Sequence, residues 1–234
     1  MDEPARAQEV LGVNEIIRRL PPYFTISCCS ARNSGKSVLI QELVKELIKQ
    51  KRVDIVMVMS GSAGLNDDFS FLPAKLVMTF NPELLEALWN RQVSLPEESR
   101  KHVLLVVDDA LGSPDAFRNI TLQKIFSQGR HCFFSCIICS QHTTYLLTPI
   151  IKGNSDIIAW SRLGRSQIKT LWESTVNIDL KQFTNISEGI GGKDYQFLIF
   201  DNFGMARAKD YTDFITVVKA TPTPNKLPGK TVKK

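Results

Sequence analysis

The sequence predicts an α/β fold, a mostly parallel sheet with helices on both faces, and two patterns carry this prediction. Short apolar runs alternate along the chain with longer stretches whose apolar residues recur at helical spacing. The short runs are apolar at nearly every position, which is typical of strands covered on both faces. Buried strands that alternate with helices in this way favour a parallel α/β sheet.

The elements begin with a strand and a helix joined by a short loop. Residues 23–29 are a β-rich apolar run, and residues 37–50 carry apolar residues at helical spacing. Two runs near the end, residues 195–200 and 205–211, flank a turn-rich link and predict an antiparallel hairpin at the edge of the sheet. Further strands are expected at residues 53–59, 75–80, 102–107, 133–139 and 156–160, and further helices at residues 82–92, 113–128 and 167–173.

Composition indicates one globular domain, or at most a domain with an appendage. The chain has 234 residues, of which 43% are apolar, and this excludes collagen-like, disordered and coiled-coil proteins. Its net charge of +5 comes from residues 219–234, which hold five lysines and no acid. The rest of the chain is balanced, so the fold as a whole is not expected to be a surface that coats nucleic acid.

Neither a secretory signal nor a membrane span is expected. Two acids stand in the first three residues without an apolar core behind them, and nowhere do eighteen apolar residues run together. The five cysteines lie mostly inside apolar runs, which suits buried, reduced thiols in a reducing compartment. We therefore expect a protein that is not secreted.

The loop between the first strand and the first helix carries the clearest motif. Its sequence, S-A-R-N-S-G-K-S, fits the phosphate-loop pattern G-x-x-x-x-G-K-[ST] except that Ser30 replaces the first glycine. Backbone N–H groups at a helix N-terminus would surround a phosphate, Lys36 would bridge the β- and γ-phosphates, and the Ser37 hydroxyl would hold Mg²⁺. The expected nucleotide-binding residues are Ser30, Ala31, Arg32, Asn33, Ser34, Gly35, Lys36, Ser37 and Val38.

Two carboxylates follow a later apolar run, L-L-V-V-D-D. A buried parallel strand presents such acids at its C-terminal edge, where ligands bind in open α/β sheets. Asp108 is then expected to hold Mg²⁺, and Asp109 to orient or deprotonate the water that attacks the nucleotide. The alternative is a pair of acids that caps the next loop.

Two further residues flank the next expected strand. Gln141 follows it at the same edge, where an amide suits sensing of the γ-phosphate or the water, although it is also an ordinary start for a loop. Arg130 precedes the strand and so lies at the opposite edge from its own nucleotide. It is expected either to be structural or to act across a subunit boundary, as an arginine finger; Arg118, Arg162 and Arg165 are rivals for that role.

Together, S-A-R-N-S-G-K-S, L-L-V-V-D-D and Q-G-R-H-C-F-F-S-C-I-I-C-S-Q resemble the poxvirus-type genome-packaging ATPases of large double-stranded DNA viruses and virophages, within the HerA and FtsK superfamily. The resemblance implies a P-loop NTPase with an additional-strand (ASCE), RecA-like core. It also implies a homo-oligomeric ring, a pentamer or hexamer, that uses ATP to drive double-stranded DNA into a preformed capsid. It assigns the metal to Asp108, hydrolysis to Asp109, and the coupling of the γ-phosphate to movement to Gln141.

The residues predict the organisation of the chain, and the resemblance implies its setting. Residues 1–20 are expected to be a helical or extended segment, residues 21–218 the ATPase domain and residues 219–234 a flexible basic tail. Capsid portal or vertex proteins are possible partners, and the virion or a viral factory in the host cytoplasm is the expected location. ATP is preferred to GTP, because the one N-K pair, Asn225-Lys226, continues with Leu-Pro and supplies no guanine-reading aspartate.

Two other functions stay open at this stage. A nucleoside or small-molecule kinase would share the phosphate loop but needs an arginine-rich lid, and residues 61–71, a potential lid, contain no arginine. A non-hydrolysing module would hold nucleotide as a structural ligand and dock on a capsid or on DNA. For a motor, we expect residues 61–68 to contact DNA in the assembled ring.

Overall fold

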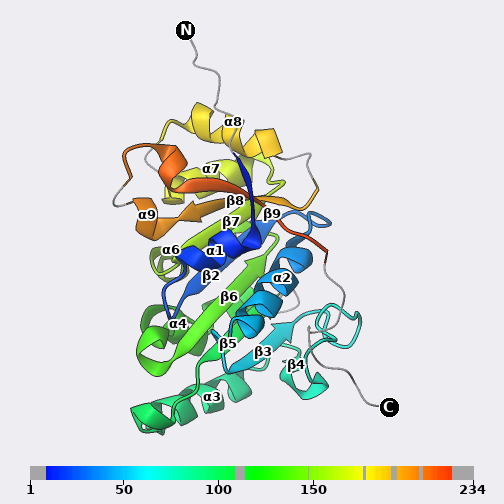
Figure 1. Ribbon diagram of the computed structural model, residues 1–234, viewed down its shortest axis with the longest axis vertical. Helices are drawn as coiled ribbons and strands as arrows, with labels where there is room; N and C mark the ends of the chain where they lie inside the picture. The colour runs from blue at the N-terminus through cyan, green and yellow to red at the C-terminus, as the bar shows by residue number, and fades with distance from the viewer. Residues whose placement is uncertain are drawn as a thin grey trace.

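Figure 1 shows the computed structural model, which describes residues 9–108, 114–146, 148–175, 178–190, 194–205 and 208–222. Its centre is a nine-stranded sheet with the order β1-β9-β8-β7-β2-β6-β5-β3-β4. All neighbouring strands in this sheet are parallel except β8, which is antiparallel to both β7 and β9. The prediction of a mostly parallel sheet is confirmed.

The strands are β1 (Val10–Gly12), β2 (Thr25–Ser30), β3 (Ile55–Ser60), β4 (Val77–Met78), β5 (Val103–Asp108), β6 (Phe134–Ser140), β7 (Ile157–Ser161), β8 (Gln196–Asp201) and β9 (Ile215–Lys219). The helices are α1 (Val13–Arg19), α2 (Lys36–Lys49), α3 (Pro82–Ser94), α4 (Ile120–Gln128), α5 (Thr143–Leu146), α6 (Pro149–Gly153), α7 (Arg165–Thr175), α8 (Leu180–Ile190) and α9 (Asn202–Met205). Two 3₁₀ segments, Pro114–Arg118 and Gly129–Cys132, flank α4.

Strand β6 lies between β2 and β5 and is buried along its whole length. The three strands are parallel, with Cys29 of β2 opposite Ser140 and Val107 of β5 opposite Ile138. Their carboxyl ends therefore meet at one edge of the sheet, which is called the nucleotide edge below. The extra strand between the loop-bearing strand and the acid-bearing strand is the additional strand that the family resemblance implies.

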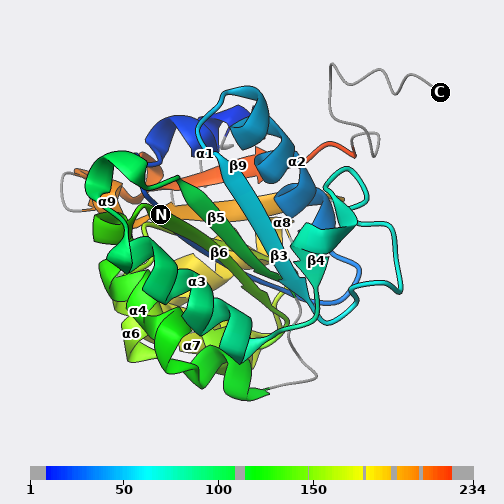
Figure 2. The same ribbon diagram turned by 90° about the horizontal axis from the view of Figure 1, so that it is seen from below.

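Helices cover both faces of the sheet (Figure 2). Helices α1 and α2 pack on one face, and α3 and α4 pack on the other. Alternate residues of one strand serve the two cores: in β2, Cys28 faces the α2 side and Cys29 the α4 side. A third core joins α7 and α8 to β7, β8 and β9. Burial on both faces explains why these strands are apolar at nearly every position.

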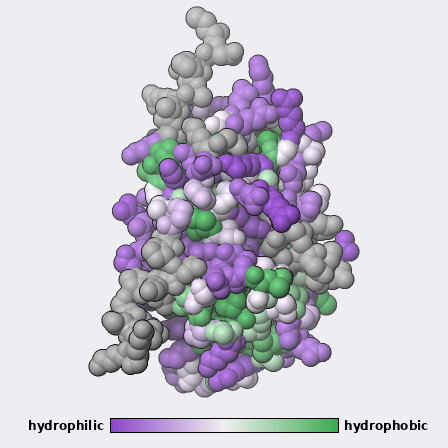
Figure 3. Space-filling model, turned by 90° about the vertical axis from the view of Figure 1, so that its right-hand side faces the viewer, coloured by the Kyte–Doolittle hydropathy of each residue, from purple (hydrophilic) through white to green (hydrophobic). Residues whose placement is uncertain are grey.

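The surface on the β4 side has a hydrophobic part and a hydrophilic part. Figure 3 shows hydrophobic residues gathered in its lower half, where Figure 1 places β3 and β4, while its upper half is mostly hydrophilic. Strand β4 ends the sheet here with two half-buried residues, Val77 and Met78. The strand expected at residues 75–80 is thus shorter than predicted, and so short an edge offers little backbone for pairing with another chain.

The hairpin prediction is right for its first strand and wrong for its second. Strand β8 matches residues 195–200, but its partner β9 is Ile215–Lys219, not residues 205–211. Two aspartates explain the difference: Asp201 accepts a hydrogen bond from Gly204 N (2.9 Å) at α9, and Asp210 caps the 3₁₀ turn Tyr211–Asp213. Nor is the hairpin outermost, because β1 pairs with β9.

Other elements depart from the prediction at their ends. The helix expected at residues 113–128 is divided at Asn119, whose side chain caps α4 by accepting a hydrogen bond from Leu122 N (3.0 Å). The expected tail begins where β9 ends at Lys219, and most of it, residues 223–234, lies outside the described residues.

Among the helices that the structure describes, none has the length and apolar character needed to cross a bilayer.

Candidate nucleotide-binding site

The loop between β2 and α2 is a tight turn at the N-terminus of a 14-residue helix. Asn33 (φ 57°) and the N-cap Gly35 (φ 93°) have left-handed backbones, and Ser34 Oγ donates to the Ala31 carbonyl (2.8 Å). Since no side chain caps α2, the N–H groups of its first turn remain for an anion. This is the arrangement that a phosphate loop requires.

Ser30 fits the loop although the pattern calls for glycine there. It is the last residue of β2, fully buried, and it does not have a positive φ. A side chain is therefore compatible with the backbone at this position, and its hydroxyl is buried in the fold. The departure from the motif leaves the turn intact.

Lys36 and Asp108 are brought together from distant parts of the chain. Lys36 Nζ lies 3.6 Å from Asp108 Oδ1, and their side chains are 10% and 3% exposed. The ammonium suits a phosphate, and the carboxylate, with the hydroxyl of Ser37 in the first turn of α2, is a hard-oxygen donor set that suits Mg²⁺. The first acid of the predicted pair is thus at the site; the second, Asp109, lies outside the described residues.

Gln141 also lies at the nucleotide edge, directly after β6 and therefore between the ends of β2 and β5. Its carbonyl accepts a hydrogen bond from the side chain of Gln167 on α7 (2.8 Å). The preceding residue, Ser140, accepts through its hydroxyl from His142 N (3.0 Å). These bonds fix the turn that carries the glutamine beside the phosphate loop.

Arg130 lies at the opposite edge, in the 3₁₀ segment that enters β6. The seven residues of β6 separate it from the nucleotide edge by about 20 Å. Arg130 does not reach the phosphate loop of its own chain, as its position in the sequence predicts.

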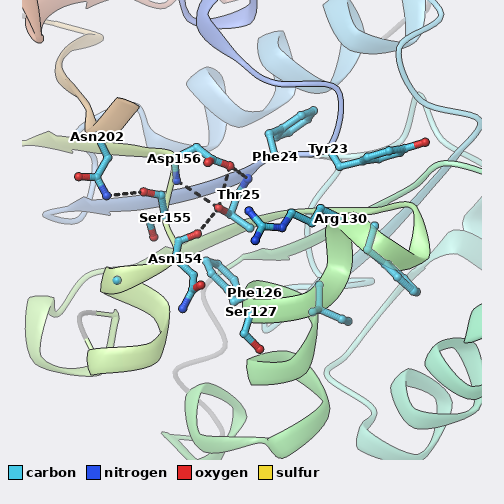
Figure 4. Close-up of a pocket in the computed structure, with 13 residues that line it drawn as sticks. Tyr23, Phe24, Thr25, Phe126, Ser127, Arg130, Asn154, Ser155, Asp156 and Asn202 are labelled. Carbon is cyan, nitrogen blue, oxygen red and sulfur yellow. Dashed lines mark hydrogen bonds between the residues drawn. The ribbon is translucent and has the colours of Figure 1, made fainter. Parts of the chain in front are cut away.

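A pocket of about 390 Å³ surrounds Arg130 at this edge (Figure 4). The arginine side chain runs toward Thr25 and Asp156, and Asp156 Oδ2 accepts from Thr25 N (2.7 Å) and Thr25 Oγ1 (3.0 Å). Burial raises the pKa of Asp156, while the bonds from Thr25 and the charge of Arg130 act to lower it. The pocket is separate from the phosphate loop.

Three residues near the phosphate loop were not assigned from sequence to the nucleotide site of their own chain: Arg162, Asp194 and Tyr195. Arg162 was named only as a rival for the arginine that acts across a subunit boundary. Arg162 Nη1 donates to the Asn33 carbonyl (3.2 Å) and Nη2 donates to Asp194 Oδ1 (2.9 Å). Tyr195 lies against Gly35, where an added Cβ would come 2.5 Å from its ring. Arg162 follows the end of β7 directly, so the strand-end rule that found Asp108 and Gln141 is the signal for it.

Comparison with curated proteins finds a relative by sequence. No protein-family model matches the chain. "Uncharacterized protein 015R" of Frog virus 3 (isolate Goorha) is 27% identical over 128 residues, a match that covers 53% of this chain and 39% of that protein. The match thus spans about two fifths of the length of that relative.

Several solved structures match this chain over more of its length than the sequence relative does. The genome packaging NTPase B204 from Sulfolobus turreted icosahedral virus 2, in complex with ATP-gammaS, has a TM-score of 0.62 at 16% identity, over 87% of this chain and 99% of B204. The chain shares the fold of this packaging NTPase. The pCW3 conjugation coupling protein TcpA (TM-score 0.59, 14% identity, 86% of this chain and 61% of TcpA) and the bacterial conjugative coupling protein TrwBdeltaN70 (0.58, 10%, 96% and 92%) share it too.

Proposed function

We propose that this protein is an ATP-driven motor that packages double-stranded viral DNA into a preformed capsid. The observation that carries the proposal is the Lys36–Asp108 pair at the phosphate loop of an additional-strand sheet. The match to a genome packaging NTPase over 99% of its length supports the same conclusion. The virion or a viral factory in the host cytoplasm is the corresponding location, with capsid portal or vertex proteins as partners.

The residues at the nucleotide edge have separate roles in ATP hydrolysis. The loop amides and Lys36 bind the phosphates, and Ser37 and Asp108 hold Mg²⁺, which when bound neutralises charge on the phosphate oxygens. Asp109 orients or deprotonates the attacking water, and Gln141 senses the γ-phosphate from its position after β6. Lys36, Ser37 and Gln141 follow strands that end at this edge, and Asp108 is the last residue of another such strand.

The positions of Arg130 and the phosphate loop at opposite edges favour a ring, a pentamer or a hexamer. In a head-to-tail ring one edge of each subunit faces the other edge of its neighbour. Arg130 would then reach the ATP of the next subunit, where a guanidinium stabilises the charge that develops on the transferred phosphate. This requires its side chain to turn outward from the pocket in Figure 4 when a neighbour docks.

ATP turnover with and without long duplex DNA, at two protein concentrations, tests the proposal. The expected result is turnover that DNA stimulates and that grows more than proportionally with protein, because each site is completed by a neighbour. Asp109→Asn is the control, since it should abolish turnover while ATP binding is retained.

Other outcomes would contradict the motor. Phosphate transfer to an added nucleoside, independent of DNA, would indicate a kinase. Nucleotide binding with no turnover at any concentration, and no effect of Asp109→Asn, would indicate a binding module.

A further inference from the structure

The loop clamp is defined here as Arg162, Asp194 and Tyr195. These residues flank the ends of two neighbouring strands, β7 and β8. Arg162 follows β7 and Tyr195 precedes β8, which is antiparallel to β7, so both lie at the nucleotide edge. Strand β7 is also the neighbour of β2, with Ser161 opposite Ser30. The clamp therefore lies beside the phosphate loop on the side away from β6 and Asp108.

The guanidinium of Arg162 donates hydrogen bonds to a backbone carbonyl and to a side-chain carboxylate. It donates to the carbonyl of Asn33 inside the loop and to the carboxylate of Asp194 outside it. The arginine side chain is 28% exposed, whereas that of Asp194 is 82% exposed. So exposed an ion pair contributes little to folding. Its main physical consequence is the position that it gives to the guanidinium and, through it, to Asn33.

Backbone strain is concentrated at the same place. Five non-glycine residues have a positive φ in the part of the chain that the structure describes, and Asn33 (57°), Arg162 (49°) and Tyr195 (59°) are three of them. Left-handed backbone is unfavourable for residues with a Cβ and tends to be retained at functional sites. The turn at Asn33 is thus held from outside the loop by residues that are themselves strained.

Several buried polar atoms beside the loop have no hydrogen-bond partner among the described residues. They are Arg162 Nε, Ser30 Oγ, Ser161 Oγ and Gln196 Oε1. Proteins leave few buried polar atoms unpaired, so four in adjacent strand ends call for an explanation. An arginine with an unused donor at this point has capacity for a further acceptor beside the phosphate loop.

We propose that Arg162 is a positioning residue for the phosphate loop. Held by Asp194, its guanidinium fixes the carbonyl of Asn33 and so the left-handed turn that aims the N–H groups after it at the phosphates. The inference rests on the proposed nucleotide function. A loop held in this way loses less freedom when ATP binds, so Arg162 acts on ATP affinity. An arginine finger acts instead on the chemical step.

Binding of ATPγS and the KM and kcat of ATP turnover test this assignment. We expect Arg162→Ala to weaken ATPγS binding and raise KM about tenfold, with kcat within about twofold of the parent. Arg18→Ala is the matched control, because Arg18 also forms an exposed ion pair, with Glu15 (3.2 Å), but on α1. It should leave binding, KM and kcat unchanged.

Asp194→Ala tests the contacts that link Asp194 to Arg162 and Arg162 to Asn33. Asp194 is exposed, so its replacement should not prevent folding. It should weaken ATPγS binding about threefold, and adding it to Arg162→Ala should weaken binding no further, because Asp194 acts through Arg162. Unchanged ATPγS affinity in Asp194→Ala, or a large fall in kcat at unchanged affinity in Arg162→Ala, would overturn the assignment. Absence of ATPγS binding by the parent protein would instead overturn the proposed function.

Discussion

Gly35 is subject to two separate constraints at the start of α2. Its φ of 93° is left-handed, and a Cβ there would come 2.5 Å from the ring of Tyr195. Gly64 is the matched control, because its φ is 77° but such a Cβ would have no heavy atom within 4 Å. We expect Gly64→Ala to lower the free energy of unfolding by about 1 kcal/mol, and Gly35→Ala by roughly 3 kcal/mol with loss of ATPγS binding.

Denaturant unfolding and an ATPγS titration of both glycine variants measure these effects. Equal destabilisation of the two, with ATPγS affinity unchanged in Gly35→Ala, would show that Tyr195 does not constrain the loop.

His102 makes the stability of the fold depend on pH. Burial lowers its pKa, although a hydrogen bond with the Arg52 backbone and the charge of Asp54 act to raise it, and its Nε2 lies 2.7 Å from Ser135 Oγ. The unfolded chain therefore binds the proton more readily than the native one. This contribution to stability is complete above the ordinary histidine pKa of about 6.5 and is lost as the pH falls below it.

Urea unfolding at pH 7 and pH 5 measures this loss, and His102→Gln should show a smaller one than the parent. Burial raises the pKa of Asp156 and of Glu42, which acts in the opposite direction in both proteins. The comparison of parent and variant therefore isolates the histidine. A loss of the same size in both would rule out His102 as its source.

Lys36, Asp108 and Gln141 could be predicted as neighbours because each stands at the carboxyl end of a parallel strand or directly after the loop that follows one. Their meeting requires only that these strands be parallel neighbours, an order that the family resemblance implies. The same rule places Arg162 at this edge. Its contact with the loop, and that of Tyr195, depends on which strands pair beside β2, and no local pattern in the sequence specifies that pairing.

The central strands were predictable to within a few residues for a related reason. Strands β2, β3, β5, β6 and β7 are buried on both faces, so their apolar runs mark them clearly. Strand β9 was misplaced because side-chain caps at Asp201 and Asp210 interrupt the second half of the hairpin. Such caps compete with strand pairing through local hydrogen bonds that apolar patterning does not reveal.

The C-terminal segment leaves the sheet at the nucleotide edge. Ala220 N donates to the carbonyl of Tyr195 (2.9 Å) and Thr221 N to Glu42 Oε2 on α2 (2.6 Å). The sequence beyond Pro222 holds four lysines and no acid. The basic end of the chain therefore starts beside the proposed ATP site.

Truncation after Pro222 removes four lysines and should weaken binding to duplex DNA. It should reduce the slope of log K against log salt concentration by about 3.6, since each phosphate contact contributes about 0.9. Binding measured between 50 and 200 mM salt gives the slope, and ATPγS affinity should not change. An identical slope in the full and truncated chains would show that the tail lysines do not contact DNA. A full-length chain with these four lysines changed to glutamine separates charge from length.

At the scale of the whole molecule, the two edges of the sheet have different chemistry. One carries the phosphate loop, Asp108 and Gln141, and the other carries Arg130 in a pocket with Asp156. The length of β6, about 20 Å, prevents one chain from using both at a single ATP. We therefore expect ATP turnover to be a property of the boundary between two subunits.

Mixing two inactive variants tests that claim most directly. Lys36→Ala removes the phosphate contact and Arg130→Ala removes the arginine, so each alone should have little DNA-stimulated turnover. In an equal mixture about a quarter of the boundaries join an intact loop to an intact arginine, and turnover should reappear in proportion. A mixture no more active than its parts, or full activity of Arg130→Ala alone, would contradict a site completed between subunits.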